Sequence, residues 1–521
     1  MSREPRRSLG RMTVGNILKS AASRFGGREA VYCEATQRRL SFRDMNTRSN
    51  QLAHALRALA LEPGDIVAFL CSNRIEILEI YGAIAKVGLV GLPLNYRLAP
   101  SELATLINAL AATTLICDQR FGSVLDYIQA HCHAVRHYVW IGPSVPESCR
   151  AYEGLLASGS PDEPEADVQE QDAFYFNLTS GTTGLPKAYI VTHYSASALH
   201  SALLSYDARA DDVLLTVFPA FGRMAFGSLL MSVVAGARNV LANFEPERVL
   251  DLIERESVTF VWLVPTMAAL LLEVPGRSSR RIGSLRAIGF VGATLPASLV
   301  EQTRAQLCRD IYEGYGLQEA GMLTMSNPED RVRKPGSVGL PVLFSEIRIV
   351  DSAGCDVSPG AIGEIVARSP NCITEYFQSP AKNLEAFREG WFHTGDLGRL
   401  DGDGYLYIAG RVKDMIISGG QNIYASEIES ILLEMPGVAD CAIIGLPHAL
   451  WGEMVAAVLI VHNGAQLDAE RVQDYCREKL AGFKIPRQVI LQQEPLPRTA
   501  TGKVQKFILV ERYGGATAKE A

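Results

Sequence analysis

Short apolar runs alternate with helix-like segments through the first part of the chain, and this alternation limits the fold more than any other feature. Residues 66–70 and 114–117 are apolar runs of strand length. Helix-like segments cover residues 14–24, 42–59 and 76–86. Strands that alternate with helices are typical of parallel sheets covered on both faces, so we predict a layered α/β body. The same rhythm continues at residues 173–178, 213–218, 239–242, 260–264 and 287–291.

The pattern changes after Gly336. Short β-type runs at residues 346–350, 363–367 and 405–408 are separated by Gly and Asp, which predicts a small antiparallel, barrel-like subdomain. Beyond residue 413, strands and helices alternate again over about 110 residues, enough for an independent small α/β domain. The predicted fold class is therefore α/β, with a large N-terminal part of parallel subdomains and a small C-terminal domain.

Composition excludes several classes of protein. A chain of 521 residues predicts two or more domains, and 50 Lys+Arg against 57 Asp+Glu give a net charge of −7, which argues against nucleic-acid binding. The ten cysteines are scattered without CxxC pairs, as expected of reduced cytosolic thiols. The longest uncharged apolar stretch, residues 258–272, contains Pro265 and predicts a buried strand and turn rather than a membrane span. We recognise no signal peptide and expect a cytoplasmic protein.

A loop rich in hydroxyl groups follows the apolar run at 173–178. Its sequence is Thr-Ser-Gly-Thr-Thr-Gly-Leu-Pro-Lys, residues 179–187. Backbone N–H groups, hydroxyls and one ammonium can surround phosphate oxygens, and glycine permits close approach. The alternative is a flexible surface turn. The spacing does not fit the GxxxxGK[ST] pattern of a Walker A loop.

Five further motifs follow in order, and together with the loop they resemble the adenylate-forming superfamily of acyl-CoA synthetases, luciferases and adenylation domains. The motifs lie at residues 315–319 (YGLQE), 391–396 (WFHTGD), 410–414 (GRVKD), 418–429 (SGGQNI followed by SEIE) and 497–503 (PRTATGK). The fourth has the form found in the acyl-CoA ligase branch. The resemblance covers essentially the whole chain.

This resemblance implies how ATP is bound. Ser180, Thr182, Thr183 and Lys187 would hold the leaving pyrophosphate, and Tyr315 would stack on adenine. Asp396 with Arg411 would support the ribose hydroxyls, with a solvated turn acid as the alternative for Asp396. Glu319 would ligate Mg2+, with a helix-start acid as the alternative. The implied nucleotide-binding residues are Thr179, Ser180, Gly181, Thr182, Thr183, Gly184, Lys187, Gly292, Ala293, Thr294, Tyr315, Gly316, Gln318, Asp396 and Arg411.

The resemblance also implies a reaction in two steps. The catalytic residues would be Lys503, Glu319 and Thr182, with Lys503 placing its charge on the reacting phosphate and carboxylate. A C-terminal domain, residues 411–521, would then rotate on residues 1–410 about a hinge at Lys413. This rotation would bring Gly419 and Gly420 to the pantetheine tunnel of coenzyme A, although a Gly-Gly pair is also an ordinary turn.

Three positions depart from the family pattern. Ala188 replaces a glycine, which is costly only if φ is positive there. Gln318 replaces a Thr or Ser expected at the α-phosphate, and its amide can still donate a hydrogen bond. Gly222 stands where a His is usual at the mouth of the acid site. The next residue, Arg223, either pairs with a polar group of the substrate or points to solvent, and we favour solvent.

The residues that the resemblance places around the acid are mostly apolar, which favours an aliphatic, alicyclic or aromatic acid. We therefore predict an ATP-dependent carboxylic acid–CoA ligase that uses ATP, Mg2+ and coenzyme A. Alternatives are a ligase that loads a carrier-protein thiol and a degenerate nucleotide- or acyl-binding homologue. We expect no nucleic-acid partner, and whether the chain is a homodimer is left open. The acid-pocket residues are Phe221, Gly222, Arg223, Met224, Phe226, Val264, Met267, Gly314, Gly316, Gly321 and Met322.

Overall fold

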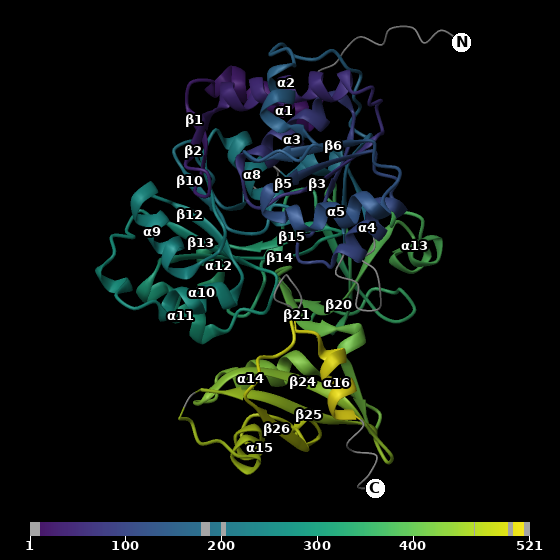
Figure 1. The fold of residues 1–521 in the computed structure, drawn as a ribbon. Coiled ribbons are helices and arrows are strands. Elements are labelled where there is room, and N and C mark those ends of the chain that lie inside the picture. Colours follow the sequence, from purple (N-terminus) through teal and green to yellow (C-terminus); the bar gives the residue numbers. More distant parts are fainter. Residues whose placement is uncertain (1–10, 179–187, 200–204, 463, 499–503, 515–521) are drawn as a thin grey trace.

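Two large sheets form most of the molecule in the computed structural model, which describes residues 11–178, 188–199, 205–462, 464–498 and 504–514. The first sheet has seven strands in the order β7-β6-β5-β3-β4-β8-β9, and all its pairs are parallel except β8 with β9 (Figure 1). Its strands are β3 Ile66–Leu70, β4 Val90–Pro93, β5 Thr114–Asp118, β6 His137–Ile141, β7 Arg150–Ala151, β8 Ala173–Leu178 and β9 Ala188–Thr192. Its helices are α1 Val14–Phe25, α2 Phe42–Ala58, α3 Ile75–Val87, α4 Pro100–Ala109, α5 Gly122–His131, α6 Tyr152–Ala157 and α7 His193–Ser197.

The second sheet has nine strands in the order β16-β15-β14-β13-β12-β10-β11-β1-β2, parallel from β14 to β1. The strands are β1 Glu29–Cys33, β2 Arg38–Ser41, β10 Val213–Thr216, β11 Arg238–Leu241, β12 Phe260–Leu263, β13 Ala287–Val291, β14 Asp310–Leu317, β15 Gly321–Ser326 and β16 Leu340–Pro341. The accompanying helices are α8 Arg223–Ala235, α9 Pro246–Glu256, α10 Pro265–Glu273, α11 Ala297–Gln306 and α12 Pro328–Arg333.

A third, curled antiparallel sheet is the predicted barrel-like subdomain. It contains β17 Glu346–Val350, β18 Gly363–Arg368, β19 Phe387–Arg388, β20 Trp391–Leu400 and β21 Leu406–Arg411, with helix α13 Pro380–Ala386 before β19. A short 3-10 helix, Val412–Asp414, leads from β21 into the C-terminal domain.

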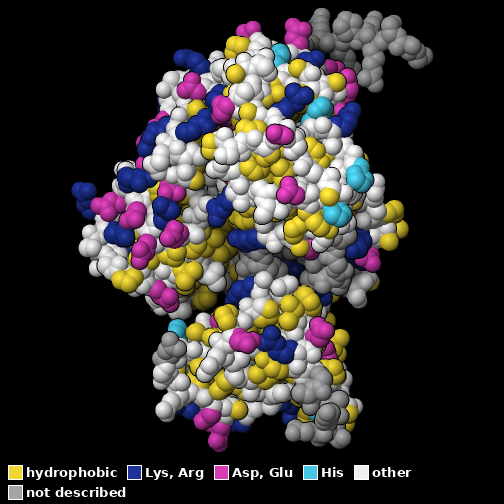
Figure 2. Space-filling view, viewed as in Figure 1, with side chains coloured by type: hydrophobic (Ala, Val, Ile, Leu, Met, Phe, Trp, Pro, Cys, Tyr) yellow, Lys and Arg dark blue, Asp and Glu magenta, His cyan; other side chains and the backbone are white. Residues whose placement is uncertain are grey.

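The C-terminal domain is built on a fourth sheet of five strands. They are β22 Met415–Ser418, β23 Gln421–Tyr424, β24 Val438–His448, β25 Gly452–Val461 and β26 Gln488–Gln492, with helices α14 Ala425–Leu433, α15 Ala469–Arg477 and α16 Lys506–Gly514. Figure 2 shows a waist between this small lower body and the larger upper one, with several Lys and Arg side chains along it. The predicted α/β fold class is therefore confirmed.

One local prediction was wrong. Residues 258–272 were expected to form a strand and a turn, and the strand is present as β12. However, Pro265 starts helix α10 rather than ending a turn. Proline is tolerated at the first helical position because the N–H it lacks has no partner there in any helix.

Candidate functional site

Most of the predicted site residues that the structure describes lie at one edge of the nine-stranded sheet. Strands β10, β12, β13 and β14 are parallel neighbours. Residues 221–224 follow β10, Val264 and Met267 follow β12, and residues 292–294 follow β13. Residues 314–316 form the end of β14 itself. These are all carboxyl ends of parallel strands, the edge where open α/β sheets bind ligands.

Tyr315, Asp396 and Arg411 come together from two sheets. The phenol of Tyr315 donates a hydrogen bond to Asp396 Oδ2 at 2.9 Å, and Arg411 Nε lies 3.1 Å from Asp396 Oδ1. Asp396 and Arg411 are direct partners across β20 and β21, so the register of this hairpin sets their pairing. Because Asp396 is 6% exposed, it is not the solvated turn acid of the alternative reading.

The chemistry of this cluster suits a sugar diol. Burial raises the pKa of Tyr315 well above its usual value, and the Asp396 carboxylate raises it further. The phenol therefore stays protonated at neutral pH and remains a donor. A carboxylate has about four acceptor sites, so Asp396 can accept further hydrogen bonds from two hydroxyl groups while keeping both protein partners.

Glu319 lies in the turn between β14 and β15, not at the start of a helix. Its Oε1 accepts a hydrogen bond from the phenol of Tyr376 at 3.1 Å, and the Glu319 carbonyl accepts one from Ile373 N at 2.8 Å. Burial, followed by the Glu319 carboxylate, raises the pKa of Tyr376, so this phenol also stays a donor.

The Glu319 carboxylate fits a magnesium ion that is shared with phosphates. Within the described ranges, no group of three His, Cys, Asp or Glu side chains is arranged to hold a metal. Mg2+ commonly takes one or two carboxylates together with water and substrate phosphates, and a half-buried carboxylate held by one phenol meets that requirement.

Gln318 is fixed by the strand that precedes the hydroxyl-rich loop. Its side-chain oxygen accepts a hydrogen bond from Asn177 Nδ2 at 3.1 Å, and Asn177 is buried near the end of β8. The amide nitrogen of Gln318 is the atom that remains for donation to a ligand. The expectation that Gln318 donates to the α-phosphate, where Thr or Ser is usual, stays a prediction.

Arg223 does not point to solvent, so the reading that we favoured from the sequence was wrong. The residue is 4% exposed at the start of α8. Its Nη1 donates to the Gln318 carbonyl at 2.6 Å and its Nη2 to the Asn371 carbonyl at 2.5 Å. The sequence around Arg223 could not reveal this, because both acceptors belong to distant segments.

Apart from Arg223, the predicted acid-pocket residues that the structure describes are apolar or glycine. Met224 and Met322 pack in one cluster with Val291, and Val264 is buried. Gly314 gives the Met322 side chain room, because a Cβ at this position would lie 2.4 Å from Met322 Sδ and would make that side chain shift. The pocket residue Phe226, by contrast, lies within the core of the seven-stranded sheet.

Phe221, also predicted in the acid pocket, packs edge-on against Tyr96 with ring centroids 5.2 Å apart. Gly222 is the N-cap of α8, and the nearest atom to a Cβ there would be the Pro219 carbonyl oxygen at 3.3 Å. Ala188 begins β9 and is not among the residues with positive φ, so its replacement of glycine carries no backbone strain.

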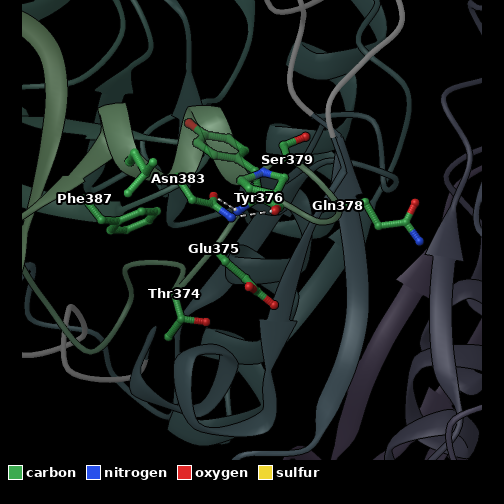
Figure 3. A pocket seen from close by; sticks show the side chains of 9 residues that line it. Thr374, Glu375, Tyr376, Gln378, Ser379, Asn383 and Phe387 are labelled. Atoms are coloured by element: carbon green, nitrogen blue, oxygen red, sulfur yellow. Dashed lines mark hydrogen bonds between the residues drawn. The ribbon is translucent and has the colours of Figure 1, made fainter.

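A cavity outside the predicted acid pocket lies beside Tyr376. It has a volume of about 500 Å³ and is open to solvent (Figure 3). Asn383 supports its wall, because its side chain accepts a hydrogen bond from Tyr376 N at 2.7 Å and donates one to Tyr376 O at 3.1 Å. The residue after Tyr376 is tied to the start of β9, because the Phe377 backbone N–H donates a hydrogen bond to the Ala188 carbonyl. Its lining residues are Thr374, Glu375, Tyr376, Gln378, Ser379, Pro380, Asn383, Leu384 and Phe387.

Gly419 and Gly420 form the two-residue turn of the β22–β23 hairpin. Both have positive φ, +56° and +78°, as a type I′ turn requires. Both are exposed, and Gly419 N donates to the Trp451 carbonyl at 2.9 Å. Lys413 lies exposed in the 3-10 helix that links β21 to β22.

Several predicted residues fall outside the described ranges. They are Thr179, Ser180, Gly181, Thr182, Thr183, Gly184, Lys187 and Lys503. One described neighbour does bear on the site, since Asn177 near the end of β8 contacts Gln318.

Three residues at the site were not predicted from the sequence. Tyr376 contacts Glu319, and Tyr189 donates from its phenol to the Gln318 carbonyl at 2.6 Å. Asn371 supplies a carbonyl to Arg223, while both polar atoms of its buried side chain lack a described partner. For Tyr189, an aromatic residue two positions after the loop was the signal available, and alone it predicts only a buried strand.

Comparison with known proteins identifies this architecture. Residues 18–377 match the AMP-binding enzyme family, and residues 427–503 match the AMP-binding enzyme C-terminal domain. The chain is 34% identical to the long-chain-fatty-acid–CoA ligase FadD13 of Mycobacterium tuberculosis over 97% of this chain and 99% of that protein. It is 35% identical to a feruloyl-CoA synthase of Amycolatopsis sp over 91% of this chain and 94% of the relative.

A solved structure shares the whole fold. The anthranilate CoA ligase AuaEII, determined in complex with anthranoyl-AMP, superposes with a TM-score of 0.90 at 29% identity, over 97% of this chain and 98% of that one. Of the helices that the structure describes, none is both long and apolar enough to span a lipid bilayer.

Proposed function

This chain belongs to the AMP-binding enzyme family and is an AMP-forming acyl-CoA ligase, and from that premise we propose that it activates an apolar aliphatic, alicyclic or aromatic acid. The carboxylate of the acid attacks the α-phosphorus of ATP, and pyrophosphate leaves. The thiol of coenzyme A then attacks the carbonyl carbon of the acyl-adenylate, and AMP leaves. The observation that carries the proposal is the assembly of Tyr315, Asp396 and Arg411 beside the apolar end of the nine-stranded sheet.

The nucleotide end of the site uses three sets of residues in this proposal. Asp396, held by Tyr315 and Arg411, accepts hydrogen bonds from the ribose hydroxyls. Residues 292–294, exposed after β13, line the adenine on the neighbouring strand end. The hydroxyl-rich loop at residues 179–187 and Lys187 within it hold the pyrophosphate as it leaves. Fixed donors at developing negative charge lower the barrier because they need no rearrangement during the reaction.

Glu319 would hold Mg2+, which would neutralise the negative charge of the substrate phosphates. Without that neutralisation, an anionic carboxylate is repelled by the triphosphate that it must attack. Tyr376 and the backbone contact at Ile373 orient the Glu319 carboxylate toward this task.

The apolar acid end supports the proposed substrate class. Met224, Met322 and Val264 offer no charged group, so a small polar acid would lose hydration there without gaining a partner. Arg223 does not change this conclusion, because its Nη1 and Nη2 each donate to a backbone carbonyl.

We further propose that residues 1–410 and 411–521 act as two domains that rotate about Lys413 between the two steps. In one arrangement Lys503 would face the reacting phosphate. In the other, the Gly419–Gly420 turn would approach the pantetheine chain of coenzyme A, since glycines leave room for a slim ligand.

Lys503→Ala tests the two arrangements. It is expected to abolish adenylate formation but to leave thioester formation from supplied acyl-AMP intact, because only the first step needs the lysine charge. Single-turnover assays of each step provide the measurement. Equal loss of both steps would contradict the two-domain account.

The function itself is tested with a panel of fatty, alicyclic, aryl and dicarboxylic acids. Pyrophosphate release is followed with Mg-ATP, with and without coenzyme A, and products are identified by mass. A coenzyme A thioester from one apolar acid class is the expected result. Pyrophosphate release without a thioester would point to a carrier-protein thiol as acceptor. No release with any acid would favour a degenerate binding homologue and would contradict the proposal.

A further inference from the structure

Arg223 combines two properties that rarely occur together. It is a cation with 4% exposure, and the described residues give it two backbone carbonyls as partners but no ion pair. Its Nε is buried without a hydrogen-bond partner among them. Buried charges are normally paired with an opposite charge, because removing them from water is costly. With no carboxylate among its described partners, the guanidinium acts on the groups beside it through the two carbonyls that it binds.

The groups beside it belong to the nucleotide end of the site. The carbonyl that Arg223 binds is that of Gln318, the residue before Glu319. Tyr189 donates to the same carbonyl at 2.6 Å, so two side chains from different elements fix one peptide group. Asn177 holds the Gln318 side chain from a third element. Side chains from three elements, α8, β9 and β8, therefore fix the position of Gln318 and of the peptide bond that joins it to Glu319.

The second contact of Arg223 fixes the other wall of the site. Its Nη2 donates to the Asn371 carbonyl at 2.5 Å, and two residues further on Ile373 N bonds to the Glu319 carbonyl. The same segment continues to Tyr376, whose phenol contacts the Glu319 carboxylate. Arg223 therefore links the segment that contains Gln318 and Glu319 to the segment 371–376, whose residues Ile373 and Tyr376 bind Glu319.

We propose that Arg223 is a positioning residue for the nucleotide and metal end of the site and does not select the acid, although it lies in the stretch expected to line the acid pocket. It acts through the Gln318 and Asn371 carbonyls, which set where the Gln318 amide and the Glu319 carboxylate stand. The inference rests on the proposed role of Glu319 toward Mg2+ and adds a residue that the motifs did not indicate.

Arg223→Met tests the proposal, because it removes the charge and both hydrogen bonds while keeping a long side chain. We expect kcat for adenylation to fall about 10- to 100-fold, the usual effect of losing a group that orients a metal ligand. The Mg2+ concentration for half-maximal rate should rise. The KM for each acid and the ranking of acids should stay as in the wild type. Arg223→Lys, which keeps the charge without the forked geometry, should recover part of the rate.

A binding measurement separates this role from turnover. Calorimetry with a non-hydrolysable ATP analogue, with Mg2+ or with EDTA, needs neither acid nor coenzyme A. The gain in affinity that Mg2+ gives the wild type should shrink in Arg223→Met. Met224→Ala, one residue along α8 and in the proposed acid pocket, is the matched control and should change the acid ranking but not the Mg2+ effect.

Tyr189→Phe covers the case in which Arg223→Met does not fold. It removes the second donor to the Gln318 carbonyl without disturbing a charge, and should reduce the Mg2+-dependent gain about fivefold, the value of one hydrogen bond. A folded Arg223→Met with altered acid ranking and normal Mg2+ dependence would overturn the proposal. So would a Tyr189→Phe variant identical to the wild type. Failure of the proposed function would appear differently, as a wild type that forms no thioester.

Discussion

Individual side chains in this protein show how position changes the chemistry of a residue. Arg223 would be solvated on most helices, yet here it is buried against two carbonyls. His193, the first residue of α7, is a second case. It is 0% exposed, its Nδ1 accepts a hydrogen bond from Val14 N at 3.4 Å, and its ring lies 4.9 Å from that of Phe174. The contact ties the start of α1 to the end of β9.

His193 makes stability depend on pH. Burial lowers the pKa of His193 to about 4, although Asp172 and Glu170 partly oppose the shift. The unfolded chain, with a histidine pKa near 6.5, therefore binds more protons between pH 6.5 and 4, so this stabilisation is full above pH 6.5 and is lost as the pH falls toward 4. We expect a loss of about 3 kcal/mol in the free energy of unfolding from this group by pH 4.

Guanidinium unfolding of the wild type and of His193→Gln at several pH values between 7 and 4 measures this effect. Glutamine can still accept from Val14 N but does not titrate, so the pH dependence of the variant should be shallower by that amount. Parallel pH profiles for the two proteins would show that His193 does not titrate as described.

At the scale of elements, the β22–β23 hairpin depends on a neighbour for its shape. The ring of Trp451 is stacked on His448 at 4.3 Å, and the guanidinium of Arg487 lies 3.7 Å from its centroid. This packing fixes the Trp451 carbonyl that receives Gly419 N. Glu453, two residues further on, accepts from Ile417 N at 2.7 Å. The Gly419–Gly420 turn, which is proposed to meet pantetheine, is therefore held in place by Trp451 just before β25 and by Glu453 within it.

Trp451→Ala should slow the second step selectively. Loss of the stacked ring loosens the Gly419–Gly420 turn, and misplacement by about 1 Å can cost up to about 100-fold in rate. We expect thioester formation from supplied acyl-AMP to fall about 10- to 100-fold, with single-turnover adenylation unchanged. Leu450→Ala, at a neighbouring side chain that is 77% exposed, is the control. Equal loss in both steps would mean that Trp451 serves only the stability of the domain.

At the scale of the whole molecule, one chain segment joins the C-terminal domain to the rest. The 3-10 helix Val412–Asp414 provides this link, and the hydroxyl of Ser426 in α14 donates to the Ala409 carbonyl beside it. Figure 2 shows that the molecule is narrow between the two bodies. A rotation about Lys413 would thus require changes in few backbone angles.

Lys413→Pro tests that rotation. Proline disfavours helical geometry in the preceding residue, Val412, and fixes its own φ, so the link should lose freedom. We expect steady-state thioester synthesis to fall about 10- to 100-fold, since the two steps then no longer follow one another readily. Lys413→Ala, which removes the side chain and keeps the backbone free, should retain most activity. If the proline variant performed as well as the alanine variant, Lys413 would not be the hinge.

Sequence alone predicted the site residues that belong to a recognisable motif, but not those that reach the site only through the fold. Periodicity placed β8 and β13 within their observed bounds, and motif order indicated that Tyr315, Asp396 and Arg411 belong to one site. Arg223 was misjudged because its partners are backbone carbonyls, which every residue possesses and no side-chain pattern reveals. Tyr376 was missed for a similar reason, since only the fold brings it to Glu319.

The pairing of Tyr315 with Asp396 and Arg411 also has a consequence for synthesis on the ribosome. Tyr315 emerges roughly 100 residues before Arg411, which takes about 5 to 20 s at ordinary elongation rates. Its carboxylate partner Asp396 and then Arg411 are both made after it, so the three-residue cluster cannot be complete before β21 has been translated. On the proposed assignment, a nascent chain therefore cannot bind the ribose of ATP through this cluster until synthesis has passed Arg411.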